Sequence, residues 1–218
     1  MASFNKTLQT QRFDDYRYYH QSRINQTLHL ISAVIFLVTY ALLFKDPAMA
    51  GLLGWLAMLT RQTGHFFFEP NGYDAVNDVT NEYKEAVKVG YNQKRKIVLL
   101  LVWGMVPVML FVFPTLFGLF AEPTSRMDFV RHVGLLWLAV GIGGGLFRVI
   151  QLFAIKDAAT GLIWALKVLS DPFHNIALYW KSPLALARGE LIDPTIKDAS
   201  HWGAADDEVD AEEAAHLT

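Results

Sequence analysis

The chain has 218 residues, of which 53% are hydrophobic and 18% are charged, and its formal net charge is −2. A soluble domain carries about 25% charged residues, so this composition favours a membrane protein. The near-neutral net charge argues against a nucleic-acid partner. The absence of cysteine excludes disulfides and thiolate metal sites, and it leaves the redox compartment open.

The first two predicted membrane spans form a tight hairpin. One apolar segment covers 28–44, and a short connector at 45–47 leads to a second apolar segment at 48–59. The second segment has only 12 apolar residues, whereas a helix needs about 20 to cross a bilayer. The second helix is therefore predicted to continue through 60–68 and to carry Arg61 and His65 in its last turns.

The third and fourth predicted spans cover 97–120 and 132–155. Both are long enough to cross a hydrocarbon core of about 30 Å. Pro107 and Pro114 predict a kink in the third span, because proline interrupts the hydrogen bonds of a helix. Four glycines predict close packing of the fourth span against a neighbouring helix: Gly141, Gly143, Gly144 and Gly145.

The remaining segments are too short or too polar to cross a membrane. A polar stretch at 69–96 joins the second and third spans. The segment at 160–187 is mixed, and Asp171-Pro172 predicts a turn within it, because the residue before a proline avoids the helical conformation. Three of its aromatic residues are typical of a helix at the lipid–water interface: Trp164, Tyr179 and Trp180. The acidic tail at 201–218 is predicted to be disordered.

The sequence thus predicts an all-α fold, a polytopic membrane bundle of about four transmembrane helices with additional interfacial helices, as one domain over 1–200. Basic residues gather before the first span, between the second and third, and after the fourth. The other side has only Lys45, Arg126 and Arg131. The positive-inside rule then predicts a multi-pass protein with cytoplasmic termini, in a bacterial inner membrane or the endoplasmic reticulum.

Four histidines lie at the cytoplasmic ends of these predicted segments: His20, His29, His65 and His174. Single histidines are common at helix ends as interfacial polar residues, but four on one side favour a shared metal site. His20 and His29 are nine residues apart, which places them on opposite faces of an unbroken helix. Both can join one site only if the chain bends between them, and Ser22 or Asn25 is the expected cap of a new helix there.

Glu69 and Arg61 are the candidate catalytic residues. Glu69 follows His65 by four residues, and a histidine and a carboxylate one helical turn apart can hold one metal. The alternative is that Glu69 and Pro70 simply end the helix. Arg61 and Arg148 are charged residues inside predicted spans, so either is a candidate partner for a substrate carboxylate. Imidazole and carboxylate ligands without thiolates favour a metal such as iron.

Two motifs flank the hairpin of the first two spans: Tyr19-His20…Asn25…His29, and Gln62…Gly64-His65-Phe66…Phe68-Glu69. In this order they resemble the membrane 2-hydroxy fatty acid dioxygenases of fatty acid α-oxidation, a family formerly catalogued as a domain of unknown function. The resemblance covers 16–71 and implies an Fe(II) cofactor held by His20, His29 and His65, with Glu69 at the family's acidic position. His174 is the candidate for a fourth histidine. The implied reaction is the oxidative decarboxylation of a 2-hydroxy fatty acid by O2.

Two alternatives remain open. A di-iron lipid hydroxylase or desaturase would need many histidines in tight clusters, and the seven histidines of this chain form no such cluster in the sequence. A haem-binding or transport subunit would use His29 and His65 as axial ligands. The expected partners are a lipid or fatty acyl substrate, O2 and the bilayer, and the oligomeric state is undetermined.

Overall fold

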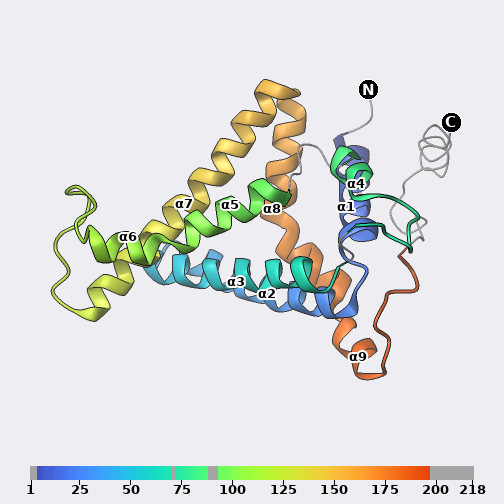
Figure 1. Cartoon of the computed structure of the whole chain (residues 1–218), viewed down its shortest axis with the longest axis horizontal. Helices are drawn as coiled ribbons and strands as arrows, with labels where there is room; N and C mark the ends of the chain where they lie inside the picture. The colour runs from blue at the N-terminus through green and yellow to red at the C-terminus, as the bar shows by residue number, and fades with distance from the viewer. Residues whose placement is uncertain (1–3, 70–71, 88–92, 197–218) are drawn as a thin grey trace.

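The computed structural model of the protein describes residues 4–69, 72–87 and 93–196 (Figure 1). These residues are mostly helical and form no extended strand, which confirms the all-α prediction. The helices in chain order are α1 (Phe4–Tyr19), α2 (Arg23–Leu42), α3 (Pro47–Phe67), α4 (Asn81–Val87), α5 (Gln93–Gly104), α6 (Val106–Val112), α7 (Arg126–Ile155), α8 (Ala158–Tyr179) and α9 (Ser182–Ala187). The predicted acidic tail at 201–218 lies outside the described residues.

The hairpin of α2 and α3 runs along the long axis of the molecule (Figure 1). Ser22 caps α2, and Asp46 caps α3 by accepting a hydrogen bond from a backbone N–H of the first turn. Because α3 continues to Phe67, the prediction that it carries Arg61 and His65 in its last turns is confirmed. The hairpin therefore brings the start of α2 and the end of α3 to the same end of the molecule.

Helix α7 crosses α3 at a contact between backbones. A Cβ atom added to Gly51 would lie 1.8 Å from the carbonyl oxygen of Gly134, so neither helix has room for a side chain there. Gly141 packs against Trp103 as predicted, since an added Cβ would lie 3.1 Å from the indole ring. The predicted packing role of the glycines at 143–145 is wrong, because no atom lies within 4 Å of a Cβ added there. Helix α7 packs on α3 before this point and on α8 after it.

The third predicted span is two helices, α5 and α6, and the predicted kink is confirmed. Pro107 has no N–H, so the carbonyl of Trp103 loses its helical partner. That carbonyl instead accepts a hydrogen bond from the Trp137 indole at 2.8 Å, and the Trp103 indole donates to the Trp137 carbonyl at 3.0 Å. The predicted continuation of the helix to 120 is wrong: α6 ends at Val112, and the chain then turns with positive φ at 116–118.

Helix α8 is a single helix of 22 residues, so the predicted turn at Asp171-Pro172 is wrong. Pro172 lies inside the helix and is buried. Contacts lie on both sides of the proline. Before it, Lys167 pairs with Asp15 of α1 and Asp171 pairs with Arg61 of α3. After it, Tyr179 packs in an apolar cluster with residues of α1. At about 1.5 Å per residue the helix is about 33 Å long. The prediction that this segment consists of short pieces is therefore also wrong.

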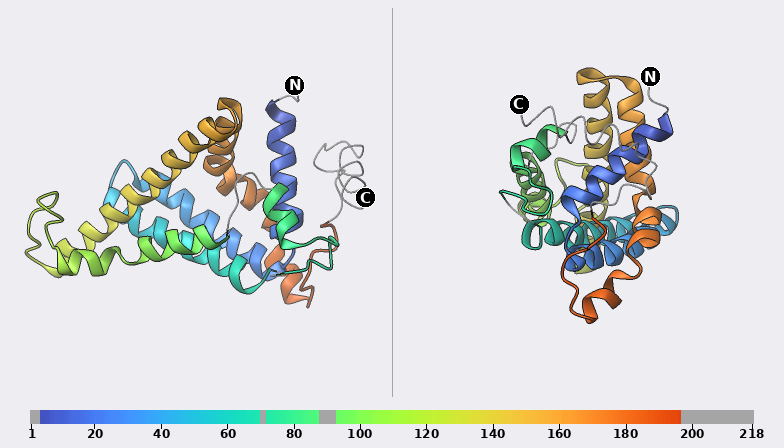
Figure 2. Two further views of the ribbon diagram at one scale, coloured as in Figure 1. Left: turned by 45° about the horizontal axis from the view of Figure 1, so that its top comes forward. Right: turned by 90° about the vertical axis from the view of Figure 1, so that its right-hand side faces the viewer.

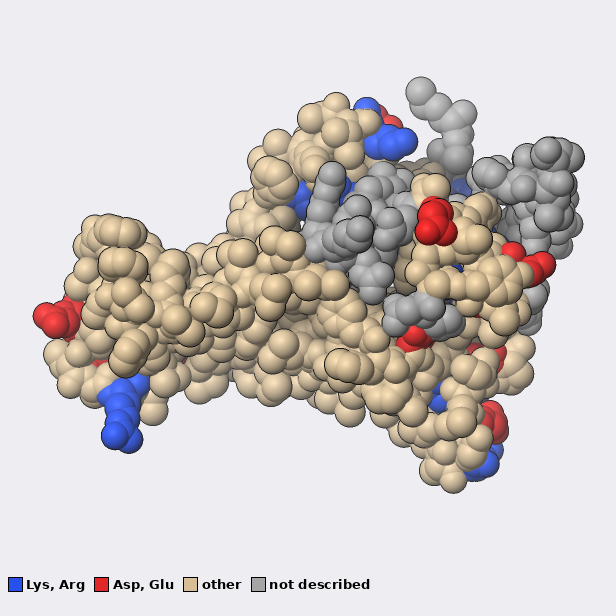
Figure 3. All heavy atoms as spheres, in the orientation of Figure 1, with Lys and Arg blue, Asp and Glu red and all other residues tan. Residues whose placement is uncertain are grey.

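Two helices, α2 and α7, are long and apolar enough to cross a membrane. In the face shown in Figure 3, the arm built on α2, α3 and α7 carries charged side chains at its tip and none along its middle. The tip includes an ion pair between Arg131 and Asp46 at 2.9 Å. At the opposite end, α1, α8 and the C-terminal described segment gather around the start of α2 and the end of α3 (Figure 2).

Candidate metal centre

Three of the four predicted histidines meet at this end of the molecule. One ligand atom from each of His20, His29 and His65 lies within 4.8 Å of the other two. The imidazole rings of His20 and His29 have centroids 4.2 Å apart, and those of His29 and His65 are 4.7 Å apart. His20 and His29 are buried, and His65 is partly exposed. The structure thus brings three of the four predicted ligands together, and that they bind a metal stays a prediction.

The bend that this arrangement requires lies between α1 and α2. Helix α1 ends at Tyr19 and α2 begins at Arg23, so His20 occupies the connection and His29 lies inside the next helix. Because the helix is broken here, His20 and His29 do not lie on opposite faces of one helix, as residues nine apart on an unbroken helix would. Ser22 is the N-cap, and its side chain accepts a hydrogen bond from Ile24 N–H at 3.2 Å. The predicted bend and cap are both confirmed.

The orientation of His20 is set by a backbone hydrogen bond. Its Nδ1 lies 2.7 Å from the carbonyl oxygen of Asp15. A carbonyl oxygen only accepts, so Nδ1 carries the proton and Nε2 is the nitrogen with a lone pair for a metal. Backbone carbonyls commonly fix metal-binding histidines in this way. The hydrogen bond therefore selects the tautomer of His20 in which Nε2 can bind a metal.

The spacing of the other two imidazoles fits one metal ion. The Nε2 atoms of His29 and His65 lie 3.1 Å apart, at the distance of a hydrogen bond between the two rings. Two nitrogens that are each about 2.0–2.1 Å from one ion lie about 2.8–3.4 Å apart at the angles of octahedral or tetrahedral coordination. The same distance fits a haem poorly, because axial nitrogens lie on opposite sides of the iron, about 4 Å apart. The donor set of three neutral imidazoles suits iron, zinc, copper or nickel.

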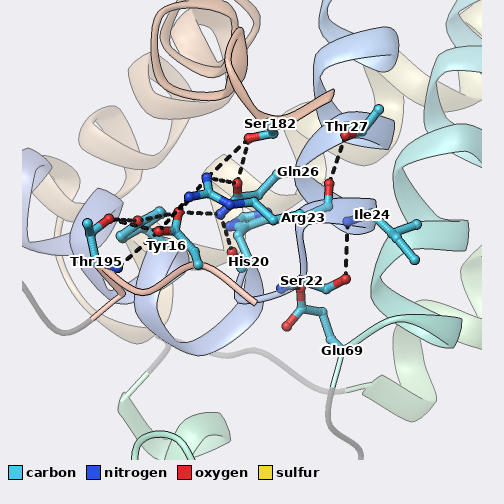
Figure 4. Close-up of polar contacts among 11 residues, drawn as sticks. Tyr16, His20, Ser22, Arg23, Ile24, Gln26, Thr27, Glu69, Ser182 and Thr195 are labelled. Atoms are coloured by element: carbon cyan, nitrogen blue, oxygen red, sulfur yellow. Dashed lines mark hydrogen bonds and ion pairs between the residues drawn. The ribbon is translucent and has the colours of Figure 1, made fainter. Parts of the chain in front are cut away.

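Two buried carboxylates hold the α1–α2 connection from opposite sides. Figure 4 shows Glu69 beside Ser22 on one side of the connection, and Tyr16, Arg23 and Thr195 on the other. On that second side, Asp193 accepts hydrogen bonds from Tyr16 at 2.7 Å and from Gln26 at 2.8 Å, and it pairs with Arg23 at 2.9 Å. The C-terminal described segment thereby fixes the turn that contains His20.

Glu69 lies outside the histidine cluster. Helix α3 ends at Phe67, so the helical spacing that would place Glu69 beside His65 does not continue. The carboxylate instead accepts hydrogen bonds from the backbone N–H groups of Gln21 and Ser22, both at 3.1 Å, and from the Asn25 amide at 2.7 Å. Its predicted catalytic role stays a prediction, and its visible role is to hold the start of α2.

Glu69 is expected to make the stability depend on pH. Burial raises the pKa of Glu69 to about 7, although the three N–H donors act in the opposite direction. Because the folded-state pKa lies above the ordinary value of 4.5, the protonated form favours folding, and this contribution is lost as the pH rises from 4.5 to about 7.

The test replaces the carboxyl group by a neutral amide. In Glu69→Gln, the unfolding free energy relative to wild type should rise between pH 4.5 and 7 and stay level above that window. The measurement is chemical unfolding in detergent micelles between pH 4 and 8. Parallel pH profiles of the two proteins would contradict the assignment.

Arg61 and His174 border a small cavity beside His20. The lining residues are Arg12, Asp15, His20, Arg61, Lys167, Asp171, His174, Asn175, Leu178 and Tyr179. Arg61 pairs with Asp171 at 3.0 Å, so the predicted catalytic arginine is held by a carboxylate. His174 lines the cavity but is not in the three-histidine group. Its predicted role as a fourth ligand stays a prediction.

The cavity carries an excess of positive charge. Its lining has three cationic side chains, from Arg12, Arg61 and Lys167, and only two carboxylates, from Asp15 and Asp171. Arg12 donates to Ser170 at 2.7 Å, while its buried Nε has no hydrogen-bond partner among the described residues. This charge favours an acidic group beside the cavity, which at about 10 Å³ has room only for a water-sized molecule.

The buried polar face of α8 was not predicted from the sequence. Lys167 and Asp171 are four residues apart within an otherwise apolar run, and this isolated pair was the available signal for an inward-facing polar surface. The same face continues to Tyr179, which is 2% exposed and lies with its ring 5.7 Å from that of His20. The predicted interfacial position of Tyr179 is therefore wrong. No local pattern in the sequence identifies Asp193, because its partners near the site are more than 160 residues away in the chain.

The fold and site define a helical protein with a buried histidine cluster at one end of an apolar arm. Comparisons of the chain with models of protein families, with curated proteins and with solved structures found no match.

Proposed function

We propose that this chain is an iron-dependent membrane oxygenase that acts on an acidic lipid, with a 2-hydroxy fatty acid as the substrate. The observation that carries the proposal is the convergence of His20, His29 and His65 within 4.8 Å. The resemblance to the 2-hydroxy fatty acid dioxygenases supports the choice of iron and of the reaction. In this reaction a 2-hydroxy acid and O2 give a fatty acid one carbon shorter, carbon dioxide and water.

The three imidazoles would hold Fe(II) through one nitrogen each. The bound iron would supply coordination positions for dioxygen and the substrate, together with the redox change that oxidation needs. Asp15 would keep the His20 Nε2 available for the metal through its carbonyl oxygen. Among the cavity cations, Arg12 is better placed than Arg61 to receive a substrate carboxylate, because Arg61 already pairs with Asp171. The positive charge thus supports an acidic substrate, and the side chains that line the cavity would have to move apart to admit its carboxylate.

We propose further that four helical segments cross the membrane: α2, α3, the α5–α6 segment and α7. The support is strongest for α2 and α7, which have sufficient length and hydropathy. Helix α3 has 21 residues, and its last turns carry the polar residues that lead to His65. The distribution of basic residues favours cytoplasmic termini and a metal site at the cytoplasmic face.

A zinc-dependent hydrolytic enzyme is the second candidate. Three histidines without a carboxylate are the protein ligands of some catalytic zinc sites, which activate a bound water. The histidine-only composition of the group is the observation that favours this candidate. A di-iron centre is less compatible with the site, since the described residues contain one three-histidine group.

The proposal is tested by metal analysis and product analysis on the same protein. Protein purified without oxygen and loaded with Fe(II) should convert 2-hydroxypalmitate into the acid one carbon shorter and consume one O2 per product. Palmitate, which lacks the 2-hydroxyl group, is the matched control and should not be shortened. Full activity of metal-free protein, or activity only with zinc and without O2 consumption, would exclude the oxygenase.

A further inference from the structure

Helix α8 has an inverted distribution of polar and apolar side chains. Its buried face includes Lys167, Asp171, Asn175 and Tyr179, at intervals of four residues. Its exposed face consists of large apolar residues, which we call the outer stripe: Leu162, Leu166, Leu169, Phe173 and Trp180. The exposed fractions of these five residues are 54%, 45%, 62%, 61% and 61%. The spacing of four, three, four and seven residues places them along one face of the helix.

This distribution, with polar residues buried and apolar residues exposed, is the reverse of that favoured for a surface helix in water. In water, a surface helix turns its apolar side to the core and leaves its charges solvated. Here Lys167 and Asp171 face inward and pair with Asp15 and Arg61, while the leucines face outward. Burying charges and exposing leucines both cost free energy in water, whereas an outer medium of hydrocarbon favours both placements.

The ends of α8 carry the charged and aromatic groups typical of a membrane boundary. Lys156 and Asp157 precede the helix, and Lys181 follows it with its ammonium group 5.0 Å from the ring centre of the exposed Trp180. Basic residues and tryptophan at helix ends are attracted to the headgroup region and to anionic lipids. Helix α8 also packs against α7, one of the two candidate membrane spans. The outer stripe is therefore continuous with a surface that already suits lipid.

We infer that the outer stripe of α8 contacts the acyl chains of a lipid bilayer. This extends the membrane-embedded surface beyond the four proposed spans to a helix whose inner face lines the cavity beside His20. Only the thickness of this helix then separates the lipid phase from the candidate metal centre. The inference does not depend on the metal or on the reaction.

The test uses the absence of cysteine from the chain, so that each label has a unique position. Single variants Leu166→Cys and Leu169→Cys carry a nitroxide label, and the protein is reconstituted into vesicles of phosphatidylcholine and phosphatidylglycerol. Glu82→Cys is the matched control, because Glu82 is also exposed on a helix but lies in the polar segment after α3. Collision rates with O2, which concentrates in hydrocarbon, and with a water-soluble nickel complex are then compared.

The labels at 166 and 169 should show a severalfold higher ratio of O2 to nickel collisions than the label at 82. Equal ratios at all three positions would show that the stripe faces water and would overturn the inference. Spin–spin broadening at 166 or 169 would show instead that a second copy of the chain covers the stripe, and this would also overturn it. Two stripe positions are used so that a local disturbance by one label does not decide the result.

Discussion

Replacing His65 by alanine is expected to lower the metal affinity by at least about 100-fold. Mutation of a residue that only hydrogen-bonds to a metal ligand lowers the affinity by about 10–100-fold, and the loss of one of three ligands should cost more. His65 lies at the end of α3 and is partly exposed, so its truncation leaves no large buried void. The Nε2 of His29 would lose the neighbour that lies 3.1 Å away. Metal content by mass spectrometry and titration with Co(II), followed by visible absorption, measure the change.

Two control variants make this result specific to the cluster. His132→Ala changes a histidine that stacks on Phe120, and its metal affinity should match wild type. His174→Ala removes the fourth candidate, which borders the cavity but is not in the three-histidine group. Its effect should be smaller than that of His65→Ala. An equal loss in His174→Ala would make His174 a ligand, and unchanged affinity in His65→Ala would refute the proposed centre.

Replacing Lys167 by methionine is expected to destabilise the protein by about 3–5 kcal/mol, the cost of leaving a buried charge without its partner. Lys167 is 9% exposed, pairs with Asp15 and lies 4.0 Å from Asp171. Methionine fills much of the lysine volume, so the loss reports on charge more than on packing. The metal affinity should also fall, because Asp15 provides the carbonyl that orients His20. Thermal unfolding and metal titration in micelles measure the two effects.

The double variant Asp15→Asn/Lys167→Met separates charge from packing. Removing both charges should recover part of the lost stability, since the aspartate is no longer buried as an uncompensated ion. Arg131→Met is a control that breaks an ion pair at the exposed tip, where its partner is Asp46, and it should change stability little. A double variant less stable than Lys167→Met alone would show that α8 is held at this point by packing and not by charge.

The sequence by itself determined the helical class and the hairpin of α2 and α3. It also predicted a group of four histidines, of which His20, His29 and His65 lie together and His174 does not. Apolar length required long helices, and the short connector at 45–47 required the first two to return side by side. That return brings His29 and His65 to one end. The nine-residue separation of His20 and His29 required a bend, and Ser22 supplied the cap that begins the new helix. These features depend on local spacing, so they are readable from the chain.

Only the tertiary structure decided the role of Glu69, the continuity of α8 and the surroundings of His20. Glu69 has the right spacing from His65, but α3 ends at Phe67 and the carboxylate reaches the backbone of α2 instead. Pro172 predicts a break, yet the helix continues, with ion pairs to α1 and α3 before the proline and the packing of Tyr179 against α1 after it. These outcomes depend on partners far away in the chain, whose contributions outweigh local conformational preference and which no local pattern of residues encodes.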